Sequence, residues 1–250
     1  MKNNKAITFA SVKKFSLFNE INDHNIKEYS LFKLGDKRII YRFGRHMASL
    51  IRKKVPNLYE DNFAIFATNK YPLNKYCRKN SFLLAEQVAK ELKKDLILGE
   101  YTYSFNADSF YDNYSQEKRN REIHIPFIKN KKRLMKKKIK IIMIDDSILS
   151  GAALRASLKE LKNITRTGTF FSVLDLRESI KPEKYFNDFA FRDGSIGILQ
   201  RIINRRGYVF TSHMLRTILA LDSNKRGNLL NALTKRKKCL FEKAAKIYFN

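Results

Sequence analysis

The sequence predicts an α/β fold in which a mainly parallel sheet is flanked by helices and followed by a helical C-terminal cap. Short apolar runs of strand length alternate with helical patterns of ten or more residues, which is typical of βαβ units. Hydrophobic residues make up 44% of the 250 residues, enough for a core and too many for a disordered chain. Nine glycines and four prolines are too few for a turn-rich all-β design.

The first half of the chain contains four predicted elements. Residues 1–35 are mixed and polar, and we treat them as an N-terminal extension. The predicted elements are an amphipathic helix over 38–55, a strand over 62–68, a helix over 81–93 and a short strand over 96–98. A basic loop over 69–80 and a long loop over 101–122 separate them.

The second half begins with a predicted strand over 140–144, a helix over 152–162 and a strand over 170–176. From about residue 180 the pattern is helical: Thr211 or Ser212 can cap a helix, and an apolar stripe from Leu229 to Tyr248 predicts a core. We therefore divide the chain into the extension 1–35, an α/β core over 36–180 and a helical C-terminal region over 181–250.

The segment after the strand over 140–144 carries the strongest chemical signal. Ligands of open α/β sheets bind beyond the carboxyl ends of the strands, where Asp145 and Asp146 can accept hydrogen bonds from ribose hydroxyls. Residues 147–151 are expected to form a loop that opens a helix, with backbone N–H groups and serine hydroxyls around a phosphate. Gly151 allows the backbone to approach that phosphate closely. The segment predicts a pentose 5-phosphate site.

The acid pair is also compatible with two other structures. Two aspartates after a strand also occur in the receiver domains of response regulators, where they hold magnesium. That arrangement requires a third aspartate about two βα units later, whereas Asp175 ends the very next predicted strand. The residues favour the sugar-phosphate site, and an acidic turn without a ligand is the remaining alternative.

The run IIMIDDSILSGAAL resembles the ribose-phosphate signature of the type I phosphoribosyltransferases. The match holds at Ile141–Ile144, Asp145, Asp146, Ser150 and Gly151, and it departs at Ala153, where the family has a hydroxyl. The resemblance implies a type I phosphoribosyltransferase-like fold that binds phosphoribosyl pyrophosphate (PRPP). It implies catalytic roles for Asp145 and Asp146 and a ribose 5-phosphate site formed by Ser147, Ile148, Leu149, Ser150, Gly151, Ala152 and Ala153.

The resemblance extends less specifically upstream, over about residues 38–178. The loop over 69–80 resembles a pyrophosphate-binding loop, with Lys70 and Arg78 as candidates, and residues 114–128 resemble the hood of the ComF-like branch. The hood candidates are Lys118, Arg119 and Arg121, whereas the zinc-binding cysteines of that branch are absent. Mg²⁺ would be held mainly through PRPP, with Asp145 and Asp146 as further candidate ligands.

The charge predicts a polyanionic partner. Lys and Arg outnumber Asp and Glu by 51 to 24, a net charge of +27, which exceeds what a small phosphorylated substrate requires. Nucleic acid is therefore a candidate partner; the alternative is compositional drift, although drift would also enrich Glu. No apolar run approaches membrane-span length, and two cysteines cannot form a disulfide scaffold, so we expect a cytoplasmic protein with no membrane contact.

Two function hypotheses follow. The first is a phosphoribosyltransferase that transfers phosphoribosyl to a nitrogen nucleophile, such as a nucleobase, and releases pyrophosphate. The second is a non-catalytic module that senses PRPP or a nucleotide, or a nucleotide-acting effector, with a basic surface for nucleic acid or a partner. The C-terminal helices are a candidate surface for a homodimer or a partner protein.

Overall fold

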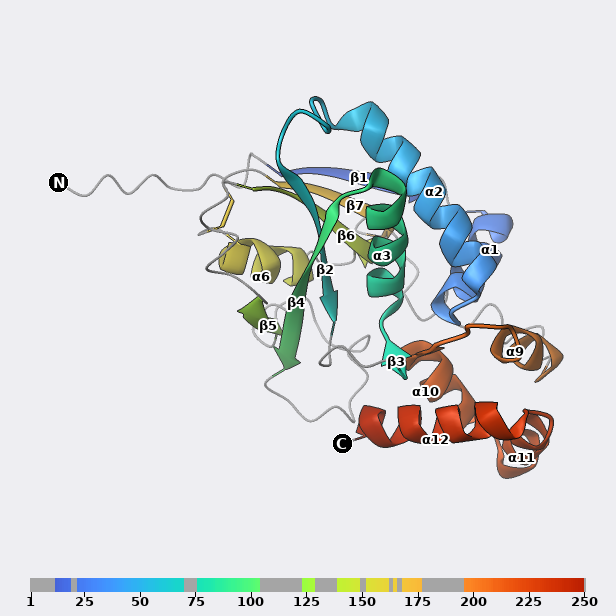
Figure 1. Cartoon of the computed structure of the whole chain (residues 1–250). Helices are drawn as coiled ribbons and strands as arrows, with labels where there is room; N and C mark the ends of the chain where they lie inside the picture. Colours follow the sequence, from blue (N-terminus) through green and yellow to red (C-terminus); the bar gives the residue numbers. More distant parts are fainter. Residues whose placement is uncertain are drawn as a thin grey trace.

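The computed structural model describes residues 12–18, 22–69, 76–103, 123–128, 139–148, 152–161, 164–165, 168–176 and 196–249. In that part of the chain, six strands form one sheet in the order β1-β7-β6-β2-β4-β5 (Figure 1). Neighbouring strands are parallel, apart from the antiparallel pair β4 and β5. The strands are β1 (Val12–Phe18), β2 (Phe63–Asn69), β4 (Asp95–Tyr103), β5 (Ile123–Ile128), β6 (Lys140–Ile148) and β7 (Gly168–Asp175).

Helices cover both faces of the sheet, as Figure 1 shows. On one face lie α1 (Asp23–Lys33), α2 (Lys37–Lys54) and α3 (Asn80–Leu92), and on the other lies α6 (Ala152–Leu161). Each face buries its own apolar cluster, and alternate residues of β6 enter opposite clusters, as strand geometry requires. The predicted fold class, a mainly parallel sheet flanked by helices with further helices at the C-terminus, is confirmed.

The predicted helices and strands of the core are confirmed, and two strands are longer than predicted. The strand expected over 96–98 runs from Asp95 to Tyr103, because β5 pairs with its second half. The strand expected to end at residue 144 continues to Ile148, because β7 pairs along it, with Asp145 opposite Ser172 and Ile148 opposite Asp175. The acid pair therefore belongs to the last part of the strand, and the loop expected from residue 147 begins no earlier than residue 149.

The residues that we treated as an N-terminal extension supply two elements. β1 joins the edge of the sheet beside β7, and Phe15 stacks on Phe171 with ring centroids 4.9 Å apart. Tyr29 and Phe32 of α1 are fully buried in the core between the sheet and α2. The sequence pattern does not reveal these elements because lysines interrupt the apolar residues of β1 and polar residues interrupt those of α1.

The C-terminal helices form a second apolar core. They are α9 (Ile196–Ile203), α10 (Ser212–Ala220), α11 (Ser223–Asn231) and α12 (Lys235–Phe249), and the short strand β8 (Phe210–Thr211) pairs with β3 (Cys77–Arg78). As predicted, Thr211 caps α10, and Leu229 and Phe241 of the apolar stripe are buried. None of the described helices is both long enough and apolar enough to span a bilayer.

Cys77 contributes to this second core. Burial raises the pKa of its thiol to about 12, so the side chain stays neutral and packs as a small apolar group. Leu34, at the end of α1, enters the same cluster. The C-terminal helices are thereby attached to the α/β core at two points, the end of α1 and the strand β3.

α2 and α3 approach each other closely at Gly44. A Cβ atom at this position would lie 2.4 Å from Cγ and 2.9 Å from Cβ of Gln87. Gln87 Nε2 also donates a hydrogen bond to Glu91 Oε1, which restricts its side chain. By contrast, a Cβ atom at Gly227 in α11 would meet no atom within 4 Å. The two glycines therefore separate the effect of packing from that of helix propensity.

Gly44→Ala is expected to lower the free energy of unfolding by about 1–2 kcal/mol, because the clash with Gln87 outweighs the better helix propensity of alanine. Gly227→Ala is expected to raise it by about 0.5–1 kcal/mol. Urea denaturation of both variants checks whether the free energy of unfolding changes in opposite directions. Stabilisation by both substitutions would show that α2 and α3 are farther apart than described.

Candidate functional site

Asp145 and Asp146 lie at the carboxyl end of the central strand β6. Both side chains are partly buried, and their carboxyl groups lie close enough to share a hydrogen bond. Each accepts a hydrogen bond from the next backbone N–H: Asp146 N donates to Asp145 Oδ1 over 2.9 Å, and Ser147 N donates to Asp146 Oδ1 over 3.0 Å. These local bonds fix the carboxylates at the end of the strand.

Lys33, the last residue of α1, binds the second carboxylate. Its Nζ lies 2.7 Å from Asp146 Oδ2, and the two side chains are only 11% and 21% exposed. The same ammonium group lies 5.7 Å from the ring centroid of Tyr29. Solvent screens an ion pair with so little exposure only weakly, so the charge of Lys33 acts strongly on Asp146. We therefore count Lys33 as a residue of the site.

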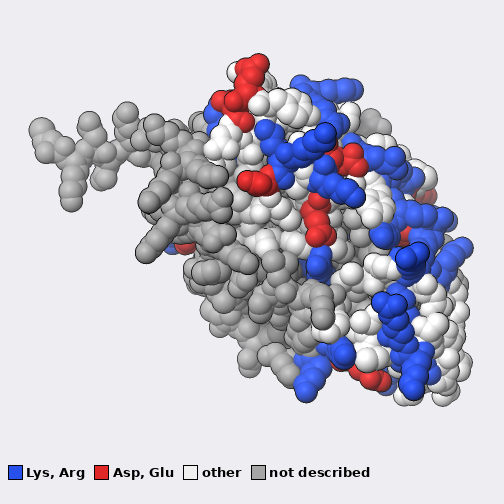
Figure 2. All heavy atoms as spheres, viewed as in Figure 1, with Lys and Arg blue, Asp and Glu red and all other residues white. Residues whose placement is uncertain are grey.

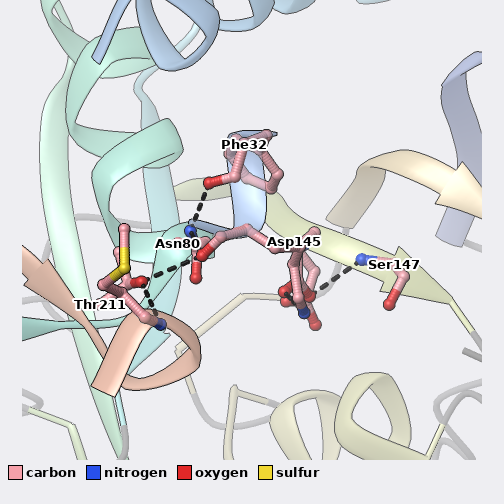
Figure 3. Close-up of polar contacts among 8 residues, drawn as sticks. Phe32, Asn80, Asp145, Ser147 and Thr211 are labelled. Carbon is pink, nitrogen blue, oxygen red and sulfur yellow. Dashed lines mark hydrogen bonds and ion pairs between the residues drawn. The ribbon is translucent and has the colours of Figure 1, made fainter. Parts of the chain in front are cut away.

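The backbone at the end of α1 is held from two sides (Figure 3). Asn80 Nδ2 donates to the carbonyl oxygens of Phe32 and Lys33, at 2.6 and 2.8 Å. Thr211 Oγ1 donates to Lys33 O at 3.0 Å while it accepts the capping hydrogen bond from Met214 N. These bonds satisfy carbonyl groups that the end of a helix leaves without intrahelical partners.

The turn that follows α1 also requires its glycine. Gly35 has a φ of +82°, a left-handed conformation that L side chains rarely adopt, and a Cβ atom there would lie 2.8 Å from Thr211. Tyr208 donates a 2.9 Å hydrogen bond to Leu34 O, and Arg205 forms an ion pair with the buried Asp36. The C-terminal helical region thus holds the segment that carries Lys33.

The two acids have opposite protonation tendencies. Burial raises the pKa of Asp145, the adjacent Asp146 carboxylate raises it further, and together they outweigh the charge of Lys79. Burial acts in the same direction on Asp146, but the charge and hydrogen bond of Lys33, together with Lys79, hold the pKa of Asp146 well below its usual range. Near neutral pH the site carries one carboxylate and one carboxyl group.

Several of the predicted phosphate-site residues lie outside the described part of the chain. Leu149, Ser150 and Gly151 are among these, so the conformation of the proposed phosphate loop stays a prediction. Ser147 and Ile148 are strand residues paired with β7. Ala152 and Ala153 are the first two residues of α6, as the helical pattern predicted.

Of the residues predicted to bind pyrophosphate or to form the hood, only Arg78 lies in the described part of the chain. Arg78 forms a 3.0 Å ion pair with Glu86 of α3, and its guanidinium group lies 5.3 Å from the ring centroid of Phe82. The side chain of Arg78 is thus engaged on α3. Lys70 and the three hood candidates, Lys118, Arg119 and Arg121, lie outside the described residues.

Sequence reasoning missed two cations of the site, Lys33 and Lys79. Lys33 lies in the segment without a clear pattern, more than a hundred residues from Asp146, so no local signal connected them. Lys79 precedes α3 and lies close enough for its charge to act on both acids. Its position in the basic loop over 69–80, which resembles a pyrophosphate-binding loop, is the sequence feature that could have marked Lys79 as a candidate.

A metal bound by protein groups alone has little support in the described residues. Among them, no three His, Cys, Asp or Glu side chains gather to hold an ion. The acid pair offers hard oxygen ligands, and Mg²⁺ is usually bound by one or two carboxylates together with substrate phosphates. Because Asp145 holds its proton and Asp146 is paired with Lys33, the acid pair fits only a Mg²⁺ ion that is held mainly by the phosphates of a ligand.

No family model and no curated protein matches this chain. Among solved structures it is similar to a hypoxanthine phosphoribosyltransferase from Staphylococcus aureus, with 11% identity, 58% of this chain and 69% of that chain covered, and a TM-score of 0.33. A glutamine mutant from an analysis of an invariant aspartic acid in HPRTs gives 10% identity, 61% and 70% coverage, and a TM-score of 0.31. A likeness this slight assigns no activity to this chain.

Lys33→Met is expected to lower the free energy of unfolding by about 1–3 kcal/mol, because it leaves the sheltered Asp146 carboxylate without its cation. Lys140→Met is the matched control, since Lys140 forms an ion pair with Asp61 at the other end of β6, where the side chains are 42% and 32% exposed. The control is expected to lose less than about 1 kcal/mol. Equal losses in urea denaturation would mean that the Lys33 pair is no more sheltered than a surface pair.

Asp145→Asn is expected to change how stability depends on pH. In the folded chain the pKa of Asp145 is raised to about 8, above the unfolded value of about 3.9, so its contribution to stability is complete below about pH 4 and is lost as the pH rises toward 8. The neutral Asn variant avoids this loss. Its stability relative to the wild type should therefore rise between pH 4 and 8, as thermal unfolding can measure. A difference that stays constant over that range would show that Asp145 is already ionised in the fold.

Proposed function

We propose that the chain binds PRPP together with Mg²⁺ and transfers its phosphoribosyl group to a nitrogen nucleophile, with release of pyrophosphate. The observation that carries this proposal is the pair Asp145 and Asp146 at the carboxyl end of the central parallel strand, directly before residues 149–151 and α6. Ligands of open parallel sheets bind at this edge. The resemblance of residues 141–154 to the ribose-phosphate signature supports the same ligand.

The protonation of the acid pair suits a vicinal diol. The carboxylate of Asp146 accepts hydrogen bonds, whereas the carboxyl group of Asp145 both donates and accepts. Ribose hydroxyls 2 and 3 likewise combine donors with acceptors. In this proposal the two acids form hydrogen bonds with the two hydroxyl groups of the diol, and Lys33 keeps Asp146 ionised.

The 5-phosphate would lie against the start of α6. Backbone N–H groups at a helix N-terminus favour an anion, and the proposal assigns Ser150 and Gly151 to the same phosphate. Ala153 lacks the hydroxyl that the signature carries, at a cost of about 1 kcal/mol in affinity. The phosphate site is therefore expected to bind less tightly than a site with the full signature.

In the reaction itself, the bond between the anomeric carbon and the pyrophosphate oxygen breaks and a carbon–nitrogen bond forms. The transition state resembles an oxocarbenium ion, so no covalent nucleophile from the protein is needed. The chain's task is to hold the ribose and to compensate the charge of the leaving pyrophosphate, for which Lys79, whose charge acts on both acids, is the candidate. Bound Mg²⁺ would neutralise further charge on the leaving group.

A second candidate function is a module that binds PRPP or a nucleotide without turnover. Two observations favour it: the missing hydroxyl at Ala153, and the engagement of Arg78 with Glu86 on α3. Both remove groups that a transferase would use on phosphate or pyrophosphate. In this alternative the same site binds PRPP or a nucleotide and reports its presence without a reaction.

Isothermal titration with PRPP and MgCl₂ tests binding. The wild type is expected to bind, and Asp146→Asn is expected to weaken binding roughly tenfold to a hundredfold, since hydrogen bonds to a charged group contribute about 1.5–3 kcal/mol. Asp61→Asn, which alters the ion pair at the other end of β6, should bind as the wild type does. Unfolding curves of all three proteins control for loss of fold.

A pyrophosphate-release assay over a panel of nucleobases then separates the two candidates. Release with one base supports the transferase, and binding without release under any base supports the sensor. If saturating PRPP with Mg²⁺ gives no binding heat at all, both candidates fail.

A further inference from the structure

The outer face of α2 carries cations without acids. The helix contains seven Lys and Arg and no Asp or Glu. Arg38, Arg45 and Arg52 follow one another at seven-residue intervals, which places them in one line along the exposed face, about 10 Å apart. Solvated helices ordinarily mix charges of both signs, and this one does not.

The line of arginines lies within a broader basic band. Figure 2 shows Lys and Arg gathered over the side of the molecule that holds α2 and the C-terminal helices, with Asp and Glu scattered among them in the upper part. Three acids partly offset this charge: Glu28 forms an ion pair with Arg42, Asp36 at the N-cap lies 3.8 Å from Arg38 Nε, and Glu60 is exposed just beyond the helix. The excess of cations along α2 remains large.

Exposed aromatic side chains lie on α2 and in the turn that follows it. Among the described residues, the large apolar side chains with high exposure are Tyr41 at 37% and Tyr59 at 65%. Lys37 Nζ lies 5.3 Å from the ring centroid of Tyr41, and Arg52 Nε donates a 3.1 Å hydrogen bond to Tyr59 Oη. Lys94 Nζ lies 5.5 Å from the ring centroid of Tyr59. Each exposed ring is thus accompanied by cations.

We propose that the exposed face of α2 with Arg38, Tyr41, Arg45 and Arg52, together with Tyr59 in the following turn, binds single-stranded nucleic acid. Phosphates would lie along the arginines, and exposed bases would stack on the two tyrosines. Stacking on exposed rings favours a single strand over a duplex, whose bases are already stacked. A lipid surface fits less well, because it requires Leu, Phe or Trp on the exposed face, and α2 buries its large aliphatic side chains in the core.

Fluorescence anisotropy with a labelled twelve-residue oligothymidylate tests the proposal. The triple variant with Arg38→Gln, Arg45→Gln and Arg52→Gln is expected to bind roughly tenfold to a hundredfold more weakly at low salt. The slope of log affinity against log salt should fall by about 2, because about 0.7 counterions are released for each phosphate neutralised in a single strand. A Lys235→Gln, Arg236→Gln and Lys246→Gln variant removes the same charge from exposed positions on α12 and should bind as the wild type does.

An abasic strand of the same length isolates the role of the tyrosines. The wild type should prefer the strand with bases, and a variant with Tyr41→Leu and Tyr59→Leu should lose that preference while it keeps the salt dependence. The proposal fails if the α12 variant loses binding and the α2 variant does not, or if duplex or anionic vesicles compete as well as the single strand. PRPP binding by the α2 variants should be unchanged, so this result is separate from the proposed function.

Discussion

The ion pair between Lys33 and Asp146 joins the end of α1 to the carboxyl end of β6, and the candidate site depends on it. Asp145 and Asp146 are adjacent and partly buried, so two negative charges there would repel each other in a region of low polarity. Lys33 stabilises one charge and thereby leaves the other acid to hold its proton. A site with one carboxylate and one carboxyl group follows from this single contact.

That contact depends in turn on how the end of α1 is held. Asn80, from the start of α3, and Thr211, from the start of α10, both bind the carbonyl oxygen of Lys33. Thr211 also caps its own helix, so the cap of α10 and the end of α1 share one hydroxyl group. The C-terminal helical region is therefore part of the support of the site, although it contributes none of the acids.

The sequence predicted the fold class and most of the core because strand and helix patterns differ in period, as in the alternation of residues 62–68, 81–93 and 140–144. It located the acid pair because Asp145 and Asp146 follow an apolar run and precede Ser150 and Gly151. It could not locate Lys33, because that contact joins residues far apart in the chain. The sequence also predicted that β6 ends before the acids, because carboxylates are rare inside strands. The pairing with β7 shows that the strand continues to Ile148.

The proposed function places a phosphorylated ribose at the carboxyl end of β6. Hydrogen–deuterium exchange, with and without saturating PRPP and Mg²⁺, tests this directly, because it reports where the ligand protects the backbone. We expect slower exchange in peptides that cover residues 140–152 and no change in peptides from α12. Unchanged exchange over residues 140–152 at saturation, or protection confined to other segments, would contradict the proposed function.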